Sequence, residues 1–221
     1  YHGYDPYIED RPLIYGLLQV DLYKKLYDSH IRTIMNDFIN TSYFEDSSEE
    51  LGDLSYGSAQ NDINTIFGDG YESNINEDYW FFDISQNNWN AISGILNTLD
   101  ARRNFLNNHP LMNESCPDIE YVSQNIENPQ NEDQVIISSK ITNVNEVELM
   151  LTTQQDHFNF TSYEMNDNGF NGDLVAGDDI YSCIDPFTDS GTYVQYYIRA
   201  NNENAISILP EKAEYEFYYY T

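Results

Sequence analysis

Apolar side chains recur at the spacing of α-helices through residues 1–112. Residues 21–39 carry one apolar face with a repeat of three or four positions, and the same period runs from a capping Asp83 or Ser85 to Leu106. Two further segments fit the pattern less closely: residues 12–18 and 47–67. We therefore expect a small helical domain over residues 1–112.

From residue 117 to residue 221 the pattern changes to an alternation of apolar and polar positions, which is typical of β-strands. In residues 192–201, Val194 and Tyr196 point one way and Tyr197 points the other. Seven segments show this alternation: 119–124, 135–141, 146–151, 158–164, 179–184, 192–201 and 213–220. Seven short strands in about a hundred residues are typical of an immunoglobulin-like sandwich. The expected fold is α+β with two domains, a helical one over 1–112 and a seven-stranded antiparallel sandwich over 117–221.

Between the predicted helices lies an aromatic, acidic segment, residues 71–82, which we expect to be a loop. Its ring side chains, together with Trp89, suggest two alternatives. Tyr79, Trp80 and Trp89 could form a platform on which a carbohydrate stacks, or they could pack into the helical core. We favour the core, because clustered aromatic residues are more often buried than presented to a ligand.

The composition excludes several classes of partner. The net charge is −29, and only nine residues are Lys or Arg, so binding to nucleic acid phosphates or to an anionic membrane surface is not expected. No apolar stretch is long enough to span a bilayer, so membrane insertion is not expected either. The acidity suits a solvated surface in a salty or divalent-rich medium. The two cysteines, Cys116 and Cys183, could form a disulfide or remain as two buried thiols.

The most distinctive stretch is Asn166–Tyr181, in which four aspartates lie among three glycines. Oxygen-rich side chains on a glycine-broken loop suit calcium, and the predicted ligands are Asp167, Asn171, Asp173 and Asp178. The alternative is a series of turns in which Asp and Asn side chains accept backbone N–H groups and no metal is needed. The spacing does not fit an EF-hand.

No catalytic residue is predicted. The sequence lacks the Gly-x-Ser-x-Gly and His-Glu-x-x-His motifs, and carboxylates are too abundant for any pair to be singled out as acid and base. The chain itself is therefore expected not to be an enzyme.

Two parts of the sequence resemble known families. Arg11-Pro12-Leu13-Ile14-Tyr15-Gly16-Leu17-Leu18, with Tyr23–Tyr27, Ile31–Ile34 and Leu99–Leu106, is similar to the C-terminal helical part of the CotH family. Met165–Tyr181 looks like the marker of the immunoglobulin-like module that often follows CotH domains, although Asp179 stands where such modules commonly have Gly. The resemblance implies a secreted or spore-coat protein with an atypical protein-kinase fold. The nucleotide-binding region and metal-binding Asp motif of that family would precede this chain, so none of its catalytic residues is carried over.

These observations lead to one favoured function and two alternatives. The favoured one is a non-catalytic, C-terminal fragment of an extracellular or cell-surface CotH-like protein, whose sandwich is a spacer or interaction module. In the first alternative, the chain supports an extracellular protein kinase whose catalytic residues lie upstream. In the second, it is a carbohydrate- or surface-adhesion module. The expected partners are the missing upstream part of the parent, which the first residues suggest was once attached, and a protein or glycan surface.

Overall fold

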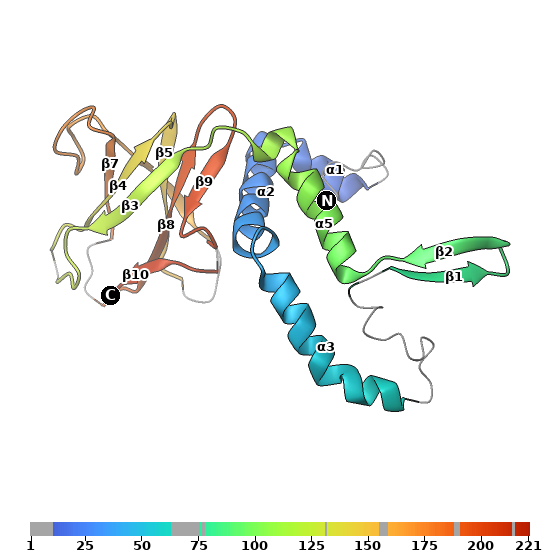
Figure 1. Cartoon of the computed structure of the whole chain (residues 1–221). Helices are drawn as coiled ribbons and strands as arrows, with labels where there is room; N and C mark the ends of the chain where they lie inside the picture. Colours follow the sequence, from blue (N-terminus) through green and yellow to red (C-terminus); the bar gives the residue numbers. More distant parts are fainter. Residues whose placement is uncertain are drawn as a thin grey trace. The chain divides into compact units, whose positions relative to one another are not determined.

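The computed structural model describes residues 11–62, 76, 78–130, 132–154, 159–187, 191–213 and 215–221. Their fold is mixed α+β with antiparallel sheets, which confirms the predicted class (Figure 1). Contacts divide the chain into two compact units. The first combines residues 1–33 with residues 114–221, and the second is residues 34–113. No described helix combines the length and the apolar composition that a membrane crossing needs.

The first unit contains two antiparallel sheets. One has the order β10–β8–β5–β6, with β9 also paired to β8, and the other has the order β3–β4–β7. Their bounds are β3 Asp118–Gln124, β4 Ile136–Thr142, β5 Glu146–Thr152, β6 Thr161–Met165, β7 Ile180–Ile184, β8 Val194–Asn201, β9 Ile206–Leu209 and β10 Tyr218–Tyr220. An isolated bridge between Asn166 and Ser182 joins the end of β6 to β7, so the chain links the two sheets at that side.

The inner faces of both sheets share one core. Ile137 and Ile141 of β4 meet Leu149 of β5 and Ile198 of β8, and all four side chains are fully buried. Every second residue of β8 enters this core, as the alternation predicts. Removing such a side chain would cost about 2–5 kcal/mol, because the cavity left behind cannot collapse fully.

One described strand of the first unit was not predicted. Residues 206–209, which form β9, alternate Ile and Ser over too short a length to stand out, and the strand becomes evident only through its pairing with β8. Strand β6 begins at Thr161 rather than at residue 158, and β10 covers only the end of the predicted 213–220 segment.

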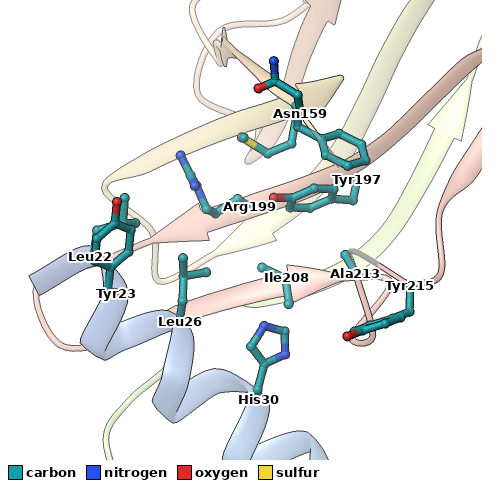
Figure 2. Close-up of a pocket in the computed structure, with 12 residues that line it drawn as sticks. Leu22, Tyr23, Leu26, His30, Asn159, Tyr197, Arg199, Ile208, Ala213 and Tyr215 are labelled. Carbon is teal, nitrogen blue, oxygen red and sulfur yellow. The ribbon is translucent and has the colours of Figure 1, made fainter. Parts of the chain in front are cut away.

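The first two helices pack with the strands. They are α1, Pro12–Leu18, and α2, Asp21–Ile34. The Lys25 Nζ donates to the Asn202 carbonyl over 2.8 Å, and the Arg32 Nη2 donates to the Ile206 carbonyl over 2.9 Å. Leu26 adds an apolar contact with the outer face of the larger sheet, beside Ile208 (Figure 2). Helical periodicity shows that α2 has an apolar face, but it does not show that a sheet covers that face.

The second unit is built from helices and one hairpin. Its elements are η3 Met35–Ile39, α3 Tyr43–Asn61, β1 Tyr79–Asp83, β2 Asn88–Ile92, α5 Ile95–Asn107 and η5 Pro110–Met112. Arg103 on α5 connects three of them. Its Nε donates to the Ile39 carbonyl, and its Nη2 donates to Glu45, each over 2.7 Å. Part of the predicted helix over 47–67 falls outside the described residues.

The β1–β2 hairpin corrects two predictions. The end of the segment expected to be a loop is strand β1, and the helix expected from Asp83 or Ser85 begins only at Ile95. Asp83 does accept N–H groups as a cap would, from Ser85 over 2.8 Å and Gln86 over 3.3 Å, but these bonds close the hairpin turn. The same local bonding can open a helix or a turn, so sequence alone did not distinguish the two.

Candidate functional site

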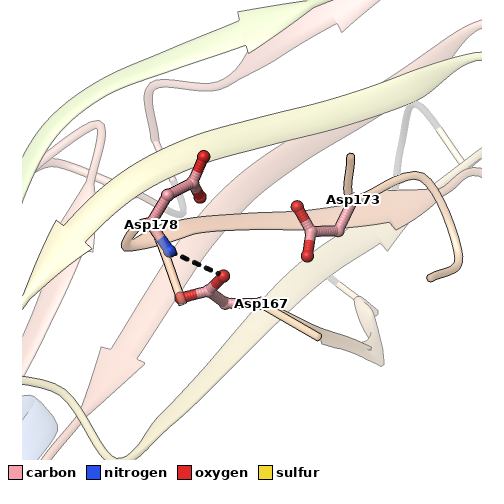
Figure 3. A group of neighbouring side chains, drawn as sticks. All are labelled: Asp167, Asp173 and Asp178. Atoms are coloured by element: carbon pink, nitrogen blue, oxygen red, sulfur yellow. Dashed lines mark hydrogen bonds between the residues drawn. The ribbon is translucent and has the colours of Figure 1, made fainter. Parts of the chain in front are cut away.

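The loop between β6 and β7 brings three of the four predicted calcium ligands together. Each of Asp167, Asp173 and Asp178 offers a carboxylate oxygen, and these atoms lie within 4.8 Å of one another (Figure 3). Asn171, the fourth predicted ligand, takes a left-handed backbone conformation with φ +55° in the turn between them. The sequence prediction therefore identified the cluster, while Asn171 serves the path of the backbone.

Backbone N–H groups also point into these carboxylates. One oxygen of Asp167 accepts from Gly177 over 2.7 Å and from Asp178 over 3.2 Å, and its other oxygen accepts from Asp179 over 3.0 Å. Asp173, which is buried, accepts from Gly169 over 2.5 Å and from Val175 over 3.3 Å. These are the side-chain turns of the alternative interpretation, and they offset part of the repulsion between the acids.

The turns also explain why residues with a left-handed backbone conformation lie next to the aspartates. Gly172 has φ +98°, and a Cβ there would approach Ile136 Cγ2 to 3.0 Å, so glycine is needed for both its conformation and its closeness to the sheet. Asp179 has φ +65°, in the region where glycine is favoured. The position at which this sequence departs from the resembled module thus keeps a left-handed turn without glycine.

The calcium prediction is compatible with this hydrogen bonding, because each of the three carboxylates keeps an oxygen that accepts no more than one N–H bond and so has a lone pair left. Calcium takes six to eight oxygen ligands, so three carboxylates would be only part of its shell. We propose that a cation here would stiffen the loop.

A second acidic group is buried away from this loop. Asp185 follows β7 and is only 2% exposed. One of its oxygens accepts from the Phe187 N–H over 2.9 Å, and the other has no hydrogen-bond partner in the part of the chain that the structure describes. Burial raises the pKa of this carboxyl to about 6.

Both cysteines are free thiols, which decides between the two alternatives left by the sequence. Cys183 is buried in the sheet core, and Cys116 is half-buried. Burial, with the nearby Asp185 charge, raises the pKa of Cys183 to about 11. A thiol so protonated near neutral pH is a poor nucleophile.

Three aromatic residues of the β1–β2 hairpin, Trp80, Phe82 and Trp89, are exposed, contrary to the expectation that such residues pack into the helical core. Phe82 pairs with Trp89 across the hairpin and Trp80 pairs with Ala91, so the three rings lie on one face. Trp80 and Trp89 are 61% and 62% exposed, and the Phe82 and Trp89 rings meet edge to face at 5.6 Å. Tyr79 pairs with Ile92 and lies on the opposite face, so the suggested platform would include Phe82 in its place.

No known family model matches the chain, and a search of curated proteins finds no similar sequence. The CotH resemblance therefore rests on the residues of this chain alone.

The calcium prediction has a direct test in a titration with calcium chloride followed by thermal unfolding. Binding would relieve repulsion between the clustered carboxylates and raise the free energy of unfolding, by roughly 2.7 kcal/mol at about 100 times the dissociation constant. Asp178→Asn should reduce that gain, whereas Glu164→Gln, which changes a carboxylate on β6, should not. An unfolding temperature unchanged by calcium in the parent chain contradicts the prediction.

Asp185→Asn should stabilise the protein above pH 6. The folded-state pKa of about 6 lies above the ordinary value of 3.8, so the unfolded chain loses this proton first. The free energy of unfolding of the parent chain therefore falls as pH rises through that interval. The amide does not ionise, so its advantage should grow from little at pH ~4 to as much as about 3 kcal/mol near pH ~7. Urea unfolding at several pH values measures this difference. Asp118→Asn, at an exposed position on β3, is the control, and parallel pH profiles for Asp185→Asn and the parent chain would show the interpretation to be wrong.

Proposed function

We propose that this chain is a non-catalytic module of a secreted, CotH-like protein and that its two-sheet part is an immunoglobulin-like sandwich acting as a spacer or interaction module. The shared core and antiparallel pairing of the two sheets support the sandwich. The inert character of Cys183 and the use of the clustered aspartates as turn acceptors are in keeping with a structural role.

The observation that carries this proposal is the apolar surface of the first two helices. None of the α1 residues is buried, and Leu13 is 75% exposed. A groove of about 430 Å³ runs between α1 and α2, and its lining is apolar apart from tyrosine hydroxyls: Ile14, Leu17, Leu18, Tyr23, Leu26 and Tyr27. Contiguous apolar surface of this kind is typical of an interface.

We infer that another part of the parent protein covers this groove. The expectation that a CotH-like helical segment packs against an upstream kinase-like portion supports this occupant. The alternative in which the parent is an extracellular protein kinase uses the same interface. In that case, this chain would hold the catalytic portion in place and contribute no catalytic residue.

The hairpin supports a second candidate function, adhesion to a glycan surface. The exposed face formed by Trp80, Phe82 and Trp89 presents wide apolar rings, and sugar rings stack on such surfaces through their C–H faces.

The proposed interface predicts that Leu17→Glu acts differently in two contexts. In this chain, Leu17 is exposed, so the substitution should change the free energy of unfolding by less than about 0.5 kcal/mol. In a longer parent that covers the groove, the same change would place a charge in an apolar interface and cost at least about 2 kcal/mol. Thermal and urea unfolding of both proteins compare the two values. Equal effects in both would exclude a covered groove, and Lys24→Glu on α2 is the control for added negative charge.

Adhesion through the hairpin predicts that the chain binds an array of neutral glycans and that Trp80→Ala removes the binding. The ring of Trp80 is exposed, so its loss should leave the unfolding temperature nearly unchanged. Binding retained by Trp80→Ala would assign the interaction to another surface.

A further inference from the structure

A cavity of about 520 Å³ lies within the first unit, between α2 and the outer face of the larger sheet. Its floor is formed by outward-facing residues of three neighbouring strands, including Met150 of β5, Tyr197 of β8 and Ile208 of β9 (Figure 2). Tyr23 and Leu26 of α2 form the wall on the opposite side. Its volume is within the range of ligand pockets, about 300–1,000 Å³, and most of its lining is apolar or aromatic.

One residue of the lining, Arg199, is charged and belongs to an ion pair. Arg199 of β8 faces Glu148 of β5 across the sheet, and its Nε donates to a Glu148 oxygen over 2.7 Å. The Ser162 hydroxyl donates to the other Glu148 oxygen. The two charged side chains are only 12% and 18% exposed. Burial acts to raise the pKa of Glu148, but the hydrogen bonds from Arg199 and Ser162 keep it below the ordinary value, so the carboxylate is charged at neutral pH.

Removing two charges from water carries a free-energy penalty, and a well-packed apolar pair in the same place is often at least as stable. Stability alone therefore does not explain an ion pair in this position. Only the Nε of Arg199 is used in the bond to Glu148, and a guanidinium has further N–H groups on its two Nη atoms. Arg199 therefore brings N–H donors to the side of an apolar floor. The exposed Asn159 adds an amide, which both donates and accepts, to the same lining.

The aromatic residues complete the surface. Phe160 packs edge to face against Tyr197, with ring centroids 5.1 Å apart, and also contacts the ring of Phe217, with centroids 5.3 Å apart. Tyr23 is 49% exposed, so its ring is accessible from solvent. Apolar rings beside paired donors and acceptors match a ring-shaped ligand that is apolar on its faces and hydroxylated around its edge.

The charge of the chain narrows the class of ligand further. The net charge of −29 repels phosphates, uronates and other acids, and the Arg199 charge is already balanced by Glu148. A purely apolar ligand would cut the ion pair off from water and leave its remaining hydrogen-bonding groups without partners. A neutral polyhydroxylated ring satisfies both conditions.

We propose that the cavity between α2 and the outer face of β5, β8 and β9 binds a neutral saccharide of one or two rings, with Tyr23 contacting a ring face and Arg199 and Asn159 binding hydroxyls. This site is separate from the hairpin, and it shares Tyr23 and Leu26 with the lining of the α1–α2 groove.

The test is a titration of the whole chain with maltose, cellobiose and N,N′-diacetylchitobiose, followed by NMR of backbone amides. A half-open cavity of this size should bind at least one of them with a Kd on the order of 1 mM. Amide shifts should concentrate in β8, in β9 and around Tyr23, and they should saturate.

Two variants locate the site, and a third controls for loss of a tyrosine. Tyr23→Ala removes one exposed ring and should weaken binding about tenfold. Leu22→Trp places a larger side chain in the lining and should block it. Tyr121→Ala, which removes an exposed ring from β3 in the other sheet, should bind like the parent chain. The unfolding temperature of each variant confirms that it is folded.

Absence of saturable shifts with all three disaccharides overturns the proposal, as does equal binding by the parent chain, Tyr23→Ala and Leu22→Trp. Shifts confined to β1 and β2 and lost in Trp80→Ala also overturn it, and they would support adhesion through the hairpin instead.

Discussion

Burial of the inner faces of two antiparallel sheets is the constraint on which the first unit depends. Ile137, Leu149 and Ile198 meet in a core that excludes water, and this core sets the register of every strand around it. Because side chains alternate, the same register turns Glu148, Tyr197 and Arg199 outward. The outer surface is thus a consequence of the core. Helix α2 then settles on that surface through Leu26 and through cations that reach backbone carbonyls.

The few basic side chains of this acidic chain make structural contacts. The chain has nine basic and 38 acidic residues, so its acids already keep the surface charged. Several of the basic residues instead form contacts within the fold. Lys25 and Arg32 hold α2 against the strands, Arg103 connects η3, α3 and α5, and Arg199 stands beside the cavity. Some acidic side chains have a local structural role. Asp83 and Asp167 accept backbone N–H groups in turns, which lets carboxylates act as local structural elements.

Several elements followed from the sequence because their signals are local. Alternation predicted the strands that flank the core, and the grouping of aspartates with glycines predicted a loop that brings Asp167, Asp173 and Asp178 together. The hairpin was missed because an Asp that accepts N–H groups can begin a helix or close a turn. Strand β9 was missed because four residues carry too little periodicity, and its formation depends on β8.

The sequence by itself determined the α+β class, the alternation of the core strands, the acidity from which no anionic partner is expected, and the candidate calcium ligands. Those properties depend on residue type and on spacing along the chain. The tertiary structure alone decided that α1 and α2 pack with the strands, that Trp80 and Trp89 are exposed, and that Arg199 lines a cavity walled by Tyr23. These properties depend on contacts between residues that are far apart in the sequence. A local pattern shows that a segment has an apolar face, but it does not show which other face covers it.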